Sequence, residues 1–122
     1  MILAYPVVSM ESPPTHGGSR RNLIGANPDP KLVEELSNEK HVTKETPPTF
    51  IFQTDDDKAV PAENCVQFYL ALRKAGVPAE LHVYAHGRHG VGLAPNDPVL
   101  SSWPDRLAAW MKGLSLIEVR AK

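Results

Sequence analysis

The sequence predicts an α/β domain with a mostly parallel sheet and helices on its faces. The clearest signal is the stretch from Thr49 to Pro61, where a short apolar run is followed by three aspartates and a proline. An apolar run bounded by turn residues is typical of a buried strand, and proline is favoured at the first position of a helix. A second strand pattern follows the helix, and such a crossover keeps both strands parallel.

Composition and charge favour a single folded domain over residues 1–122. Hydrophobic residues make up 42% of the chain, which is enough for one core. The formal net charge of −1 gives no indication of a nucleic-acid partner or a membrane surface, and no apolar run is long enough to span a bilayer. The lone cysteine, Cys65, is expected to be a buried thiol. No basic segment of a secretory signal is present, so the compartment is not predicted.

The amino-terminal part is predicted to hold one strand and short helices. Residues 2–8 are apolar throughout, which indicates a buried strand, although Pro6 cannot donate to a sheet ladder. Residues 9–48 are expected to form a loop with two short helices. One covers Arg20–Ile24, and the other is capped by Asp29.

The rest of the chain is predicted to form a βαβ unit and a last helix. Strands are expected at 49–53 and 80–85, with a helix from Pro61 to Ala75 between them. Glycine follows that helix directly, which is typical of a helix end. A last helix capped by Ser102 is expected within 49–114, and residues 115–122 form a tail.

Two loops of the βαβ unit carry the residues that suggest chemistry. Since the strands are parallel, the acidic loop and the histidine-containing loop 86–92 leave the same edge of the sheet. If the strands are neighbours, Asp57 and His89 come within hydrogen-bonding reach. A carboxylate that orients an imidazole is part of a nucleophile–histidine–acid triad.

The residues of these two loops also allow simpler interpretations than a catalytic triad. Asp55 and Asp56 are expected to be turn residues, and His86 is the alternative candidate for the histidine. His82, His86 and His89 lie within eight residues, a grouping that suggests either a metal site or, for His82, a surface position on a strand. They lack the one-turn helical spacing of a zinc site, so neither a metal nor another cofactor is predicted.

Four stretches resemble a known family. They are Tyr5-Pro6-Val7-Val8-Ser9-Met10, Pro47-Pro48-Thr49-Phe50, Asp57-Lys58-Ala59-Val60-Pro61 and Gly87-Arg88-His89-Gly90. Together they resemble the carboxyl half of an α/β-hydrolase of the dienelactone-hydrolase-like group that includes acetyl-xylan esterases and proteins labelled endo-1,4-β-xylanase B. The resemblance implies that Asp57 is the triad acid and His89 the triad histidine. It also implies a small ester substrate, with acetylated carbohydrate as the favoured kind.

The sequence departs from this family in one respect. The Gly-x-Ser-x-Gly motif that carries the nucleophile does not occur in the 122 residues. Because the triad order in these enzymes is Ser, acid, His, the serine is expected upstream of Ile2. We therefore expect an incomplete α/β-hydrolase fold that is inactive by itself. Ser9 is the best placed of the seven serines, but no helix-forming sequence follows it.

The sequence is also compatible with functions other than ester hydrolysis. The chain is alternatively a non-catalytic remnant or a partner-binding subunit, or part of a peptidase of the same fold. Glycoside hydrolysis typically uses two facing carboxyl groups, which an Asp–His pair does not provide. If a neighbouring strand is absent, the apolar strand at 2–8 presents an open edge, and either an edge-paired dimer or an aggregating, poorly packed state is expected.

Overall fold

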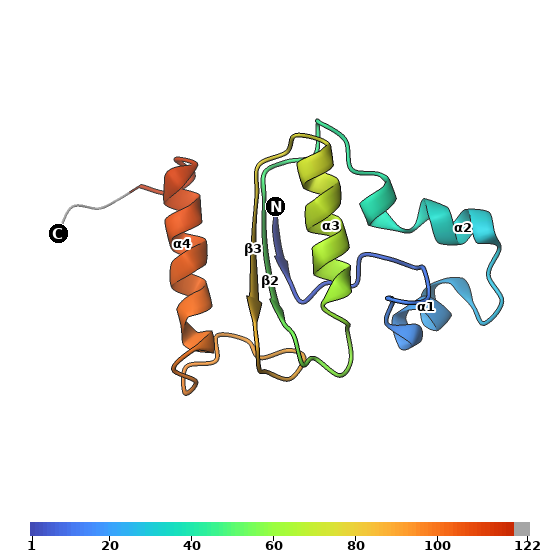
Figure 1. The fold of residues 1–122 in the computed structure, drawn as a ribbon, viewed down its shortest axis with the longest axis horizontal. Coiled ribbons are helices and arrows are strands. Elements are labelled where there is room, and N and C mark those ends of the chain that lie inside the picture. Colours follow the sequence, from blue (N-terminus) through green and yellow to red (C-terminus); the bar gives the residue numbers. More distant parts are fainter. Residues whose placement is uncertain (119–122) are drawn as a thin grey trace. The chain divides into compact units, whose positions relative to one another are not determined.

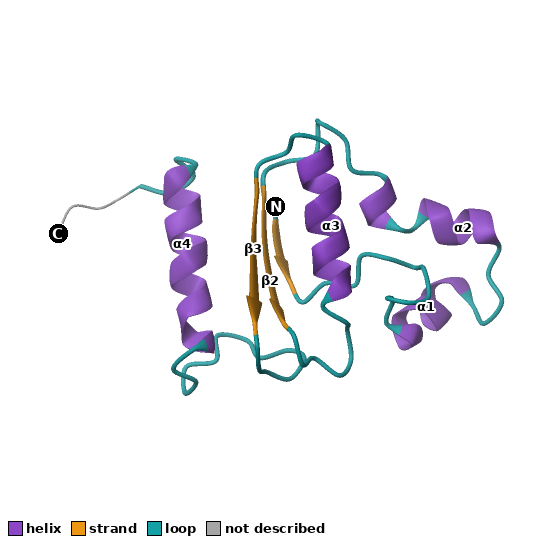
Figure 2. Ribbon diagram, in the orientation of Figure 1, coloured by secondary structure: helices purple, strands orange, loops and turns teal. Residues whose placement is uncertain are grey.

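The computed structural model describes residues 1–118, which fall into two compact units, Met1–Gly90 and the residues from Val91 onward (Figure 1). The first unit contains a three-stranded parallel sheet in the order β1 (Ile2–Ala4), β2 (Thr49–Thr54) and β3 (Ala79–Tyr84). Figure 2 shows helix α3 (Glu63–Lys74) lying along this sheet. The predicted α/β class is confirmed. Among the described residues, no helix has both the length and the hydropathy to cross a bilayer.

The central strand β2 anchors the core of the first unit. All six of its residues are buried, and α3 packs its apolar face against them. The buried side chains on this side of the sheet are Val8, Ile51, Cys65, Phe68, Leu72 and Val77. Burying a side chain of this size stabilises a fold by about 1.5–3 kcal/mol, so these contacts fix the position of α3 on the sheet.

The predicted strand over residues 2–8 is corrected to the three residues of β1. It ends because Tyr5 takes a left-handed backbone conformation, with φ of +41°, and Pro6 has no N–H to donate. The strand is parallel to β2, as predicted, but it is not buried, since Ile2 is 50% exposed. Within residues 1–118 no strand pairs with the other side of β1.

The helices of the first unit begin and end at residues that cap them. Helix α1 (Gly17–Ile24) starts earlier than predicted because the ring of His16 accepts the N–H of Ser19. Helix α2 (Pro30–Glu35) is capped by Asp29 as predicted, and a short 3-10 helix, η1 (Asn38–Lys40), follows it. Helix α3 starts two residues after Pro61 and ends before Gly76, whose φ of +74° suits glycine.

The described residues of the second unit form one 3-10 helix and one α-helix. A 3-10 helix, η2 (Leu100–Ser102), leads into helix α4 (Trp103–Gly113). The predicted Ser102 cap is corrected, because its Oγ donates to the carbonyl of Val99 rather than accepting an N–H of α4. Residues 119–122 of the predicted tail lie outside the described residues.

Candidate active site

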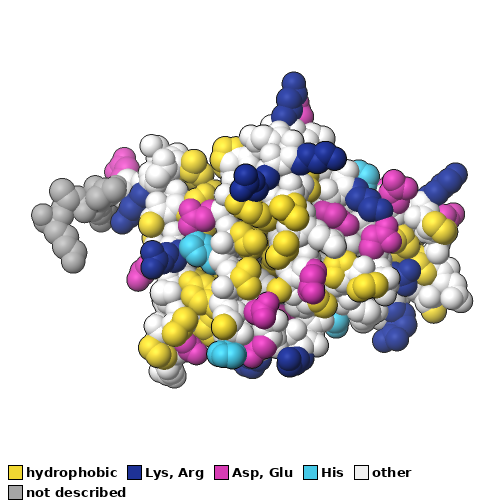
Figure 3. Space-filling model, in the orientation of Figure 1, with side chains coloured by type: hydrophobic (Ala, Val, Ile, Leu, Met, Phe, Trp, Pro, Cys, Tyr) yellow, Lys and Arg dark blue, Asp and Glu magenta, His cyan; other side chains and the backbone are white. Residues whose placement is uncertain are grey.

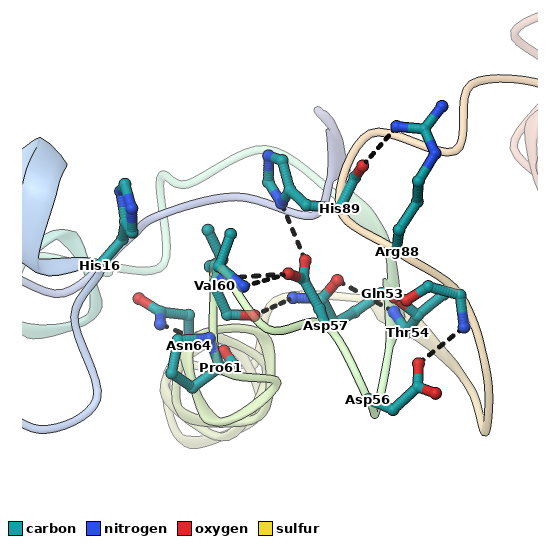
Figure 4. A network of polar contacts seen from close by, with 12 residues as sticks. His16, Gln53, Thr54, Asp56, Asp57, Val60, Pro61, Asn64, Arg88 and His89 are labelled. Atoms are coloured by element: carbon teal, nitrogen blue, oxygen red, sulfur yellow. Dashed lines mark hydrogen bonds and ion pairs between the residues drawn. The ribbon is translucent and has the colours of Figure 1, made fainter.

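The loop that follows β2 is shaped by side chains at the end of the strand. Gln53 is fully buried, and its amide donates to the carbonyl of Val60 at 3.0 Å. Its carbonyl oxygen accepts the N–H of Thr54 at 2.9 Å. One amide therefore ties the strand end to the far side of the aspartate loop, which closes the loop around Asp57 (Figure 4).

The structure brings Asp57 and His89 together across the two neighbouring loops. The Oδ2 atom of Asp57 lies 2.8 Å from Nδ1 of His89. Its other oxygen, Oδ1, accepts the N–H groups of Ala59 at 2.8 Å and Val60 at 3.0 Å. These contacts hold the carboxylate in one orientation toward the imidazole, as Figure 4 shows.

Hydrogen bonds keep the buried carboxyl group of Asp57 ionised. Its side chain has no exposed surface. Burial alone would raise its pKa, but the N–H groups of Val60 and Ala59 and the ring of His89 together hold the pKa below its ordinary value. An ionised carboxylate only accepts hydrogen bonds, so Nδ1 of His89 carries the proton. The lone pair of the neutral ring then lies on Nε2.

The environment of His89 leaves this second nitrogen available. The side chain is 40% exposed, and the residues described by the structure provide no hydrogen-bond partner for Nε2. The ring of Tyr5 packs against the imidazole, with centroids 5.0 Å apart and planes at 68°. The left-handed backbone of Tyr5 is a form of strain that is often found at functional sites. A fixed imidazole with an accessible Nε2 is suited to act as a general base.

Other residues named from the sequence lie apart from this pair. Asp55 is exposed, and His82 contacts Glu80 at 2.6 Å on β3. His86 has a side chain that is 90% exposed and lies 3.2 Å from Asp56. His86 is therefore not the histidine that meets Asp57. No group of three or more metal-ligating side chains occurs within residues 1–118.

Two structural residues of the site region were not identified from the sequence. Asn64 is fully buried in α3 and accepts the N–H groups of Val8 and Ser9, so it fixes the chain that leaves β1. Gln53 has the role described above. Their only sequence signal is an amide at a position where the pattern predicts burial. Ser9 itself is buried, and its Oγ accepts the N–H of Glu11, so it is not presented as a nucleophile.

A parallel sheet whose strand-end loops join an aspartate to a histidine, with the acid first in the chain, is the arrangement of the α/β-hydrolases. Residues 2–115 match the prolyl oligopeptidase family, and the chain belongs to that family. It is 43% identical over 103 residues to endo-1,4-β-xylanase B of Butyrivibrio fibrisolvens and 36% identical over 121 residues to an acetylxylan esterase of Xylanibacter ruminicola. These matches cover 84% and 93% of the chain.

Solved structures show the same relationship. The acetyl ester-xyloside bifunctional hydrolase of Caldicellulosiruptor lactoaceticus matches 96% of the chain with a TM-score of 0.92 and 44% identity. Carboxylesterase Cest-2923 of Lactobacillus plantarum matches 98% with a TM-score of 0.76 and 26% identity. The chain spans 43% and 46% of these two structures, and 16% and 24% of the two curated relatives. Its relatives are hydrolases, and the resemblance to the acetyl-xylan esterase group is confirmed.

Proposed function

We propose that this chain supplies the acid and the histidine of a serine hydrolase that acts on carboxylic esters. Asp57 orients His89, and Nε2 of His89 takes the proton of a serine hydroxyl and then passes it to the leaving alcohol. The nucleophilic serine comes from outside these 122 residues. The observation that carries the proposal is the 2.8 Å contact between a buried, ionised carboxylate and a half-exposed imidazole.

The favoured substrates are short acyl esters of carbohydrate, acetyl esters above all. This choice is supported by relatives whose names refer to acetylxylan esterase and acetyl ester-xyloside hydrolase. A glycosidase would need a carboxyl group free to protonate a glycosidic oxygen. Both carboxylates beside the histidine loop are already engaged, Asp57 by three N–H donors and Asp56 by Gly87 and His86. The chemistry of this region therefore favours an ester over a glycoside.

A chimaera provides the positive test. This chain would replace the matching 43% of the Caldicellulosiruptor hydrolase, which leaves the remainder of that protein in place. We expect the chimaera to hydrolyse acetylated xylosides, and His89→Ala and Asp57→Asn to lower kcat by up to about 10⁴, with losses that do not add. Asp55→Asn is the matched control and should cost far less. Equal losses at Asp55 and Asp57 would show that the acid is assigned to the wrong residue.

The isolated chain provides the negative test. It should hydrolyse p-nitrophenyl acetate no faster than free imidazole at the same concentration, and it should not react with a serine-directed fluorophosphonate. Stoichiometric labelling by the fluorophosphonate would mean that a serine within these residues is activated, and the assignment of an external nucleophile would be wrong.

Two other functions have specific support. The prolyl oligopeptidase family match favours a peptidase, which the chimaera tests by offering a peptide p-nitroanilide beside the acetyl ester. A partner-binding role is favoured by an apolar groove of about 370 Å³ beside β1, lined by residues that include Met1, Leu3, Val42 and Phe68. Figure 3 shows hydrophobic side chains at the surface over β1 and α3. A second chain that pairs with the open edge of β1 would lie next to this groove.

A further inference from the structure

The loop that carries His89 is held by two side chains of the β2 end. Oγ1 of Thr54 donates to the carbonyl of Gly87 at 2.9 Å. Oδ1 of Asp56 accepts the N–H of the same glycine at 2.7 Å. These two groups belong to the peptide units on either side of Gly87, so both units are fixed to the end of the neighbouring strand.

The backbone between these two bonds adopts a conformation that glycine permits. Gly87 has a φ of +153°, in a region that residues with a Cβ rarely occupy. Glycine reaches this conformation without strain but samples many others as well, so the two bonds, rather than the residue itself, select this one. His89 follows two residues later, so the direction in which the chain leaves Gly87 decides where the imidazole meets Asp57.

The second carboxylate oxygen of Asp56 contributes less to fixing the histidine loop. Oδ2 lies 3.2 Å from Nδ1 of His86, whose side chain is 90% exposed. A contact this open to solvent adds little to stability. The N–H of Gly87 is also the main cause that lowers the pKa of Asp56, followed by His86. The bond to Gly87 is therefore the main interaction of this carboxylate.

We propose that Asp56 and Thr54 are positioning residues, which clamp Gly87 and thereby place His89 against Asp57. The significance for catalysis rests on the proposed function, because general-base chemistry requires placement within about 0.5 Å. The clamp also explains why Asp56, which the sequence suggests is only a turn residue, lies toward the histidine loop while Asp55 faces solvent.

Nuclear magnetic resonance on the intact 122-residue chain tests the proposal without turnover. In the unaltered chain, the Nδ1 proton of His89 should be observable because Asp57 protects it from exchange. Asp56→Ala should speed exchange of the Gly87 amide by at least about tenfold and abolish the His89 Nδ1 proton signal. Asp56→Asn keeps an oxygen acceptor for Gly87 and should retain the signal. Asp55→Ala and His86→Ala are the controls and should leave both readouts unchanged.

Two outcomes would overturn the proposal. One is an unchanged His89 Nδ1 proton in a folded Asp56→Ala variant. The other is loss of that signal in His86→Ala, which would assign the effect to the ion pair. If Asp56→Ala does not fold, Thr54→Val decides, since it keeps the buried volume and removes only the donor to Gly87; it should also abolish the signal. An inactive chimaera with an intact signal would contradict the ester function and leave the positioning role standing.

Discussion

The side chain of Asn64 joins the segment after β1 to the start of α3, and its removal should destabilise the first unit. Its Oδ1 accepts the N–H groups of Val8 at 3.1 Å and Ser9 at 3.2 Å. Its Nδ2 donates to the carbonyls of Pro14 at 2.7 Å and Pro61 at 3.2 Å. The side chain is fully buried, so water does not readily replace these bonds in Asn64→Ala.

The size of the effect follows from the groups left without partners. Two buried N–H donors lose their acceptor and the buried carbonyl of Pro14 loses its donor, and each unpaired buried group costs about 1–3 kcal/mol. The Pro61 carbonyl counts for less, because it still accepts the backbone N–H of Asn64 at 3.1 Å. For these three groups the expected loss is about 3–9 kcal/mol. A small domain has only about 5–15 kcal/mol of total stability, so the variant should be strongly destabilised.

Urea unfolding followed by circular dichroism measures this loss. Asn64→Ala should lower the midpoint with little change in the slope, since the surface exposed on unfolding stays similar. Gln67→Ala is the matched control, because it removes an amide from an exposed position on the same helix and should change stability by no more than about 0.5 kcal/mol. A loss below about 1 kcal/mol for Asn64→Ala would refute the reasoning from unpaired donors.

Asp57, Cys65 and the edge of β1 are each open to a direct test. The pKa of Asp57 is lower in the folded chain than in the unfolded chain, so its contribution is fully present above the unfolded pKa and is lost as pH falls through the folded pKa. The unfolding free energy should therefore decrease less steeply with falling pH in Asp57→Asn than in the unaltered chain. The same pH dependence in both proteins would contradict this. Burial raises the pKa of the Cys65 thiol to about 12, so Ellman's reagent should react with it only after unfolding; rapid reaction of the native chain would contradict its burial. Sedimentation of the isolated chain should show a dimer, and Ile2→Lys should weaken that dimer. A monomer without exposed apolar surface would argue against pairing at β1.

The βαβ unit could be predicted from the sequence because each of its signals is local. The apolar run at 50–52, the proline before α3 and the glycine after it mark the elements directly. The parallel direction of the two strands then places the loops after β2 and β3 at one edge of the sheet. The proximity of Asp57 and His89 follows from these facts, and the structure shows it as a 2.8 Å contact.

The remaining features depend on contacts between distant residues, which sequence patterns do not encode. The end of β1 is set by the backbone of Tyr5, and no propensity predicts a left-handed tyrosine. Gln53 and Asn64 are polar side chains at buried positions, and the pattern that predicts burial there does not tell which groups their amides bind. Asp55 and Asp56 differ in role only because the loop after β3 passes beside one of them.

The placement of the acid and the histidine on one crossover has a consequence for how the site is assembled. Asp57 and His89 are 32 residues apart and are joined by contiguous chain. The loop-closure entropy of a pairing grows only slowly with length, by about 0.6 kcal/mol per doubling, so this separation costs little more than a much shorter one. The pair therefore acquires its geometry within a single folding unit. The contact between the carboxylate and the imidazole therefore does not depend on what pairs with the open edge of β1.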